Sequence, residues 1–89
     1  MDDDYGSPIS YMVLAEGTPV FASDGPEVGK VARVLAVPEK DIFDGIVINT
    51  SGGRRFVDAP EVGRIYERGV MLGIDSAEAA SLPEPDANY

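Results

Sequence analysis

Turn-forming residues interrupt this sequence repeatedly, and the runs between them are short and rich in β-branched and aromatic side chains. Such runs, alternating with turns that contain glycine, proline and aspartate, are typical of a small β-sandwich or β-barrel. The strands are expected over residues 18–21, 28–37, 43–50, 54–58, 63–67 and 70–74. The sequence therefore predicts an all-β fold of about six strands.

The two ends of the chain differ in composition from this central part. The lead, residues 1–9, is acidic, and the tail, residues 83–89, contains two prolines, so both are expected to be disordered. The folded domain then spans residues 10–82. Within it, Ser76 can cap one short helix over residues 77–82, which the first proline of the tail would end.

The alternation of apolar residues predicts which side of each strand faces the core. Val70, Leu72 and Ile74 share one side of the last strand, and Met71 is left on the other. Val47 lies opposite its two isoleucine neighbours, so this strand is expected to be covered on both sides. The core is expected to combine the central apolar residues of the runs, Val31, Ile48, Val57, Ile65 and Leu72.

The long run over residues 28–37 departs from strict alternation, because Val28, Val31 and Val34 are three positions apart. A helical segment or a β-bulge would give this spacing. The β-branched residues and Gly29 favour the bulge, which bends a strand. Bent strands allow a few strands to close into a barrel without exposed edges. A small bent-strand β-barrel is therefore expected.

Side chains suited to catalysis or metal binding are scarce. The chain has no cysteine and no histidine, which removes the usual soft metal ligands and the usual base for a nucleophile. A domain of 89 residues buries only about 60% of its unfolded surface, so an enclosed cofactor site is hard to accommodate. Asp41, Asp44 and Asp58 lie beside turns, where carboxylates usually accept hydrogen bonds from local backbone amides. We expect no enzymatic activity, no cofactor and no metal.

Acidic residues outnumber basic ones by 16 to 7, which gives a net charge of −9 at pH 7. This negative potential makes nucleic acid an unlikely partner, since its binding depends on neutralising phosphates. The cations could still form a local basic patch, although solvated strand faces are the favoured interpretation. They are Lys30, Arg33, Arg54, Arg55, Arg64 and Arg68.

No apolar run approaches the roughly 20 residues that a membrane helix needs. The start of the chain, Met1–Asp4, carries acid where a secretory signal carries base. These features predict a soluble, cytoplasmic protein without membrane insertion.

One segment of the chain recurs in part. Residues 24–31, DGPEVGKV, match residues 58–65, DAPEVGRI, at the proline, the glycine and the flanking apolar positions. Two equivalent corners built with the same turn chemistry would explain the match, and this is the favoured interpretation. A duplicated β-β unit is the alternative.

Several of these motifs, in this order, resemble the PRC-barrel family. Residues 17–31, GTPVFASDGPEVGKV, are similar to its opening, where a G-x-x-V strand leads into a D-G-x-x-(I/V)-G-K-V turn and strand. Residues 45–48 and 55–62 are similar to its middle segment and to its R-F-V-P strand with the following turn. Residues 65 and 70–72 resemble its closing hairpin.

The resemblance covers about residues 17–82 and implies a small bent-strand barrel without catalytic residues, whose role is contact with other proteins. The chain departs from the family at Asp58, where proline is frequent, and in its longer approach over residues 9–14. The family includes the cytoplasmic domain of a photosynthetic reaction-centre subunit and the carboxy-terminal domain of a ribosome maturation factor. Nothing here resembles the membrane helix of the first or the amino-terminal domain of the second, so neither role transfers.

The resemblance therefore favours a non-enzymatic protein-binding or structural module. A ribosome- or RNA-associated small barrel is the alternative, and an enzyme that uses carboxylates is a distant third.

A small barrel without a pocket must bind through its surface, around an apolar or aromatic centre. The expected interface residues are outward-facing and apolar or aromatic: Phe43, Val47, Tyr66 and Met71. They would contact a partner protein or a second copy in a homodimer. Alternatively, the short helix and the lead cover them within one chain. Tyr5 and Tyr89 are expected in solvent, and Tyr11 either there or over the end of the barrel.

Overall fold

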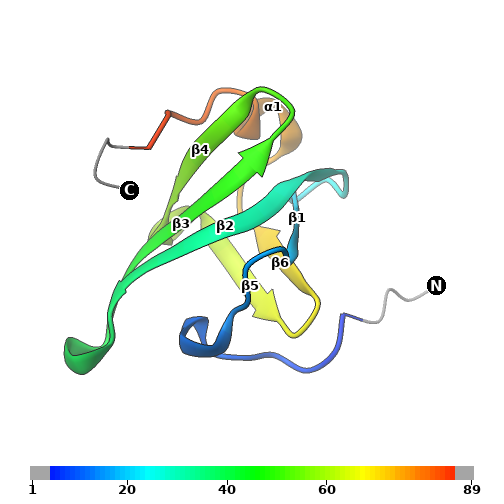
Figure 1. Cartoon of the computed structure of the whole chain (residues 1–89). Coiled ribbons are helices and arrows are strands. Elements are labelled where there is room, and N and C mark those ends of the chain that lie inside the picture. The colour runs from blue at the N-terminus through cyan, green and yellow to red at the C-terminus, as the bar shows by residue number, and fades with distance from the viewer. Residues whose placement is uncertain (1–4, 86–89) are drawn as a thin grey trace.

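The computed structural model describes residues 5–85, which form one six-stranded sheet with short helical turns (Figure 1). The strands are β1 (Pro19–Phe21), β2 (Glu27–Val37), β3 (Ile42–Thr50), β4 (Gly53–Asp58), β5 (Val62–Tyr66) and β6 (Gly69–Leu72). The 3-10 helices are η1 (Tyr11–Val13), η2 (Pro38–Lys40) and η3 (Ala59–Glu61), and α1 (Ser76–Ala79) is the α-helix of the described residues. The prediction of a mostly β chain with six strands and one short helix is confirmed.

The strands form a mixed sheet in the order β4-β3-β2-β1-β6-β5. Neighbours are antiparallel except for β1 and β6, which are parallel. Figure 1 shows β2, β3 and β4 side by side, with β5 and β6 behind them at a steep angle. The sheet does not close, because β4 and β5 are its two edges.

The expected irregularity of the long strand is present in β2. Its register against β3 shifts between Val31 and Arg33 and again between Leu35 and Ala36. Each shift is a bulge or irregularity that adds local bend and twist. The interpretation of the three-residue spacing as a bulged strand is therefore confirmed, and the helical alternative is wrong.

The main core lies between the two halves of the sheet and α1. Four of the five expected core residues, Val31, Ile48, Val57 and Leu72, are buried, whereas Ile65 is half-buried and packs against their cluster. Other members include Val20, Ile46, Val70, Ala79 and Leu82. α1 and the residues that follow it thus close one side of the core.

A second, smaller apolar cluster lies on the other face of β2 and β3. Leu35 and Val47 are buried at 7% and 0% exposure but do not belong to the main core. Val47 is paired with Phe56 of β4, and the Phe56 ring lies against Gly45, where a side chain would collide with it. The expectation that β3 is covered on both sides is confirmed. The expectation that Val47 is available at the surface is wrong, because Phe56 covers its neighbourhood.

The ends of the described chain lie along both edges of the sheet. The Ile9 amide donates to the Ile65 carbonyl (3.0 Å) and the Arg68 amide donates to the Tyr5 carbonyl (2.8 Å), beside β5. At the other edge, the Phe56 amide of β4 donates to the Pro83 carbonyl (2.8 Å). These bonds satisfy backbone groups that an edge strand would otherwise expose. The structure thus differs from the predicted disorder at residues 5–9 and 83–85; residues 1–4 and 86–89 lie outside the described residues.

The short helix begins one residue earlier than the capping rule suggested. The N-cap is Asp75, whose carboxylate accepts from the Glu78 amide (2.8 Å) while the Glu78 carboxylate accepts from the Asp75 amide (3.2 Å). Ser76 instead donates its amide and hydroxyl to Asp24 (2.9 and 2.7 Å). The predicted N-cap is therefore wrong, and the helix ends at Ala79 where residues 77–82 were expected.

The two similar segments differ in their turns and agree in their glycines. Asp58 caps the 3-10 helix η3, whereas the first segment begins in a turn that the Gly25 amide closes by donating to the Ala22 carbonyl (2.9 Å), with Gly25 at φ 114°. Gly29 and Gly63 both lie against a carbonyl of the neighbouring strand, where a Cβ atom would collide. The close approach of two strands explains why both segments need glycine there.

Candidate interaction surface

η1 presents apolar side chains to solvent because of its geometry. The Ser10 hydroxyl accepts from the Met12 amide (3.0 Å) and starts the turn. A 3-10 helix has three residues per turn, so neighbouring side chains point in directions about 120° apart. Tyr11 and Leu14, three positions apart, turn towards the domain, and Leu14 is buried. Met12 and Val13 are left on the solvent side.

Tyr11 joins η1 to the start of β3. Its ring stacks on Phe43 with centroids 4.8 Å apart and planes at 17°. Its hydroxyl donates to the Asp41 carboxylate (3.0 Å). Burial, this hydrogen bond and the Asp41 charge raise the pKa of Tyr11 above its ordinary value of 10.0. Tyr11 therefore covers the end of the sheet, one of the two expected outcomes.

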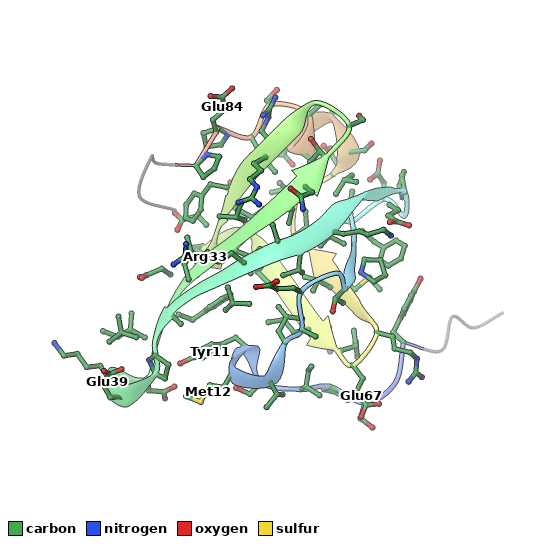
Figure 2. The ribbon with its side chains drawn as sticks, viewed as in Figure 1. Tyr11, Met12, Arg33, Glu39, Glu67 and Glu84 are labelled. Carbon is green, nitrogen blue, oxygen red and sulfur yellow. The ribbon has the colours of Figure 1, made fainter. Side chains whose placement is uncertain are left out.

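Three large apolar side chains are exposed on the two segments that meet at this junction. Val13, Met12 and Ile42 are 66%, 52% and 44% exposed, and they are the exposed large apolar residues of the described chain. Figure 2 shows Tyr11 and Met12 directed from η1 towards the turn that carries Glu39. We call Met12, Val13 and Ile42, with Tyr11 and Phe43 at their base, the Met12–Ile42 surface.

The four expected interface residues do not form one surface. Phe43 is half-buried beneath Tyr11, and Val47 is fully buried. Tyr66 is half-buried and bridged to Pro8 of the lead. Met71 is half-buried on β6, on the side away from the main core as its alternation predicts. Only Phe43 contributes to the Met12–Ile42 surface.

Met71 lines a separate hollow of about 420 Å³ together with Tyr5, Phe21 and Arg64. Tyr5 lies over this region with its ring centroid 5.1 Å from that of Phe21, and it is half-buried. The expectation that Tyr5 is in solvent is therefore wrong. The reason is the pairing of the lead with β5, which carries Tyr5 onto the sheet.

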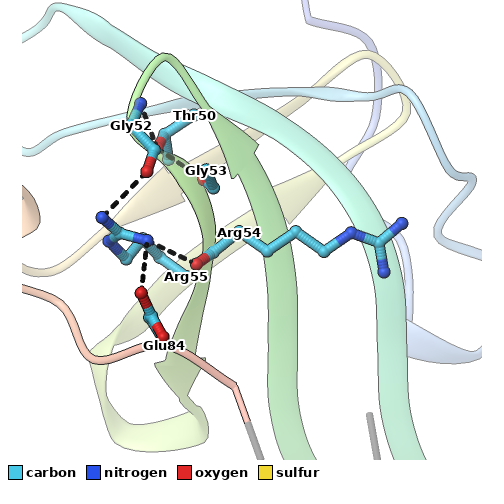
Figure 3. A network of polar contacts seen from close by, with 6 residues as sticks. All are labelled: Thr50, Gly52, Gly53, Arg54, Arg55 and Glu84. Atoms are coloured by element: carbon cyan, nitrogen blue, oxygen red, sulfur yellow. Dashed lines mark hydrogen bonds and ion pairs between the residues drawn. The ribbon is translucent and has the colours of Figure 1, made fainter. Parts of the chain in front are cut away.

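Arg55 stabilises the β3–β4 hairpin (Figure 3). Its guanidinium donates to the Arg54 carbonyl (2.7 Å) and to the Gly52 carbonyl (3.0 Å), and lies 4.0 Å from the Glu84 carboxylate. Thr50 adds two bonds: its hydroxyl donates to the Gly53 carbonyl (2.7 Å) and accepts from the Gly52 amide (3.1 Å). This turn has the hairpin role that the glycine pair predicts.

The six basic residues do not all lie on one face in the described chain. Arg33 is aligned with Val47, and Lys30, Asn49 and Arg54 are aligned across β2, β3 and β4, so Lys30, Arg33 and Arg54 share the outer face. Lys30 and Arg54 lie beside a hollow of about 450 Å³ that Glu16 and Glu27 also line. Lys30 is paired with Glu27 at 2.8 Å. Arg55 is paired with the buried Ile48, so it projects from the core-facing side. Solvated strand faces, the favoured interpretation, agree with this arrangement.

The turn carboxylates have structural partners of two kinds. Asp58 accepts from the Ala59 amide (3.1 Å), as expected for a carboxylate beside a turn. Asp41 instead accepts from the Tyr11 hydroxyl, a partner 30 positions away. Among residues 5–85, no group of three or more acidic, histidine or cysteine side chains is arranged to hold a metal ion.

Neither protein-family models nor curated proteins match this sequence. No helix within residues 5–85 combines the length and apolar character needed to cross a membrane.

Sequence reasoning missed Met12, Val13 and Ile42. Met12 and Val13 lie in the approach to the first strand, where period-two alternation gives no information, and Ile42 lies one residue before the expected strand over residues 43–50 but begins β3. The signal that could have identified Met12 and Val13 is the three-residue spacing of Tyr11 and Leu14, which places the two residues between them on the opposite side.

Proposed function

We propose that this chain is a non-enzymatic protein-binding module of the PRC-barrel type. The observation that carries the proposal is the Met12–Ile42 surface. Its three exposed large apolar residues lie on the two segments that the Tyr11–Phe43 stack joins, whereas the other large apolar side chains of the described chain are buried or half-buried. Grouped exposed apolar residues mark interaction sites more often than single ones do.

The barrel type is supported by the motif order over residues 17–82 and by the bends in β2. The twisted sheet brings its edge strands β4 and β5 to the two ends of η3. A strongly bent six-stranded sheet with its ends linked by such a short turn would form a closed barrel if β4 and β5 paired. We include a cytoplasmic setting in the proposal, based on the cysteine-free composition.

The alternative, an RNA- or ribosome-associated barrel, would need a continuous basic face. Lys30, Arg33 and Arg54 share the outer face of the sheet, but Arg55 is on the other side, and Glu16 and Glu27 lie beside Lys30 and Arg54. This mixture of charges favours a protein partner.

Affinity purification of the full chain from its native cell, with chemical cross-linking and mass spectrometry, tests the proposal. An unrelated domain of similar size and charge is the control. We expect one or a few proteins in near-equal amount to the chain, recovered equally after nuclease treatment. Recovery that depends on RNA would support the alternative, and recovery of nothing above the control would contradict the proposal.

A further inference from the structure

The Met12–Ile42 surface lies beside an excess of negative charge. Residues 38–44, which contribute Ile42 and Phe43 to it, contain three carboxylates and one cation: Glu39, Asp41, Asp44 and Lys40. All four are exposed. None of them makes an ion pair with any residue in the described range 5–85. The surface therefore has an acidic rim, in which Asp41 accepts from the Tyr11 hydroxyl and no carboxylate is neutralised by an ion pair within residues 5–85.

From this complementarity of charge we propose that the Met12–Ile42 surface binds a short basic segment of a partner protein that also carries apolar anchor residues. The inference rests on the proposed function and names the chemistry of the partner. Cations on the segment would meet the rim carboxylates, which speeds encounter and fixes orientation. Its apolar side chains would cover Val13, Met12 and Ile42, the part of the surface that gains most from leaving water.

Three features of the surface agree with such a segment. The flexible thioether of Met12 can adapt its shape to different apolar anchors. The stack of Tyr11 on Phe43 gives a rigid base at the centre, where binding energy usually concentrates. A second copy of this chain would bring a like-charged rim and a net charge of −9 to the contact, which opposes association.

The test is a titration of the ¹⁵N-labelled full chain with three synthetic peptides, followed by NMR. One peptide combines lysine and leucine, one glutamate and leucine, and one lysine and serine. We expect the lysine–leucine peptide to shift the resonances of residues 9–16 and 38–44. The other two should bind at least about tenfold more weakly, since each lacks one half of the complementarity.

Two variants sharpen the titration. Met12→Ser with Val13→Ser should weaken the lysine–leucine peptide about tenfold or more. Glu39→Gln with Asp44→Asn should weaken it too, and should remove most of its sensitivity to salt. Ala77→Ser with Ala80→Ser, on exposed positions of and after α1, is the matched control and should bind as the original chain does. Unchanged urea midpoints establish that each variant is folded.

Shifts that map to another face, or equal binding of the lysine and glutamate peptides, would overturn the inference. Concentration-dependent shifts at the surface without peptide would also overturn it, because a second copy would then be the occupant. These failures differ from a failure of the proposed function: a native protein partner cross-linked to another face would keep that function and refute this surface.

Discussion

Two apolar regions outside the main core differ in their exposure to solvent. On the outer face of β2 and β3, Leu35 and Val47 are buried, and Phe56 lies across Val47. At the end of the sheet, Met12, Val13 and Ile42 are exposed on the two segments that the Tyr11–Phe43 stack joins. Apolar character alone thus does not identify an interaction surface. What distinguishes the two regions is whether the chain itself supplies a cover.

The cover has a simple structural origin in each case. β4 returns antiparallel to β3, so Phe56 is placed directly opposite Val47. η1 is a single turn in which Tyr11 points inward and stacks on Phe43. The next two residues, Met12 and Val13, are not covered by any other segment of the described chain. An aromatic residue across a strand closes the first region, while the short turn leaves the second open.

The largest expected effect comes from placing the same substitution in both regions. Val47→Asp puts a carboxylate in a fully buried position without a partner, so it should cost about 4 kcal/mol or more of unfolding free energy. Val13→Asp, at a 66% exposed position, should change it by less than about 0.5 kcal/mol. Urea unfolding followed by circular dichroism measures both. Similar losses in the two variants would show that the regions are equally covered.

A smaller effect is expected at the base of the open region. Tyr11→Ala removes the ring that stacks on Phe43 and should cost about 1–3 kcal/mol. Tyr11→Phe keeps the ring and loses only the bond to Asp41, so its cost should stay below about 1 kcal/mol. The two urea midpoints separate packing from hydrogen bonding. A Tyr11→Phe loss as large as that of Tyr11→Ala would mean that the stack contributes little.

Much of the fold could be predicted because its signals are local. The turn residues defined the strands, and the spacing of Val28, Val31 and Val34 indicated the irregular β2. The errors concern contacts between distant segments. Ser76 has the right side chain and position for an N-cap. It does not cap the helix because it donates its amide and hydroxyl to Asp24, 52 positions away. The lead looked disordered because its sequence gives no sign that Ile9 pairs with Ile65.

The candidate site was less predictable than the fold for the same reason. Alternation correctly separated Val47 from Ile46 and Ile48, but it could not show that Phe56 would cover it. Exposure depends on what lies above a side chain, and that is a property of the whole fold. Phe43 was found because it begins a strand, whereas Met12 and Val13 lie where no strand pattern applies.

A smaller effect on stability should depend on pH, and it should differ between Asp24, which is bonded to α1, and Tyr11 of η1. The hydrogen bond from Ser76 lowers the pKa of Asp24 below its ordinary value of 3.8, so the ionised carboxylate stabilises the fold. This contribution is present above pH 3.8 and is lost as the pH falls through the lowered folded-state pKa. Asp24→Asn should therefore be less stable than the original chain at neutral pH, and the two stabilities should become similar in strong acid.

Tyr11 should behave in the opposite way. Its pKa is raised, so its contribution is present below pH 10.0 and is lost as the pH rises through the folded-state pKa. Urea midpoints from acid to pH 11, with Tyr11→Phe as the matched variant, measure both ends. A Tyr11→Phe difference that grows as the pH rises through 10.0 would contradict the assigned direction.

The most direct test of the account compares how solvent reaches the two regions in the free chain. A soluble paramagnetic probe added to the methyl-labelled protein relaxes each methyl group according to its exposure. We expect strong relaxation of the Met12, Val13 and Ile42 methyl groups and almost none for Leu35 and Val47. Equal protection of the two sets at low protein concentration would show that the Met12–Ile42 surface is already covered, which would contradict its role as an open binding surface.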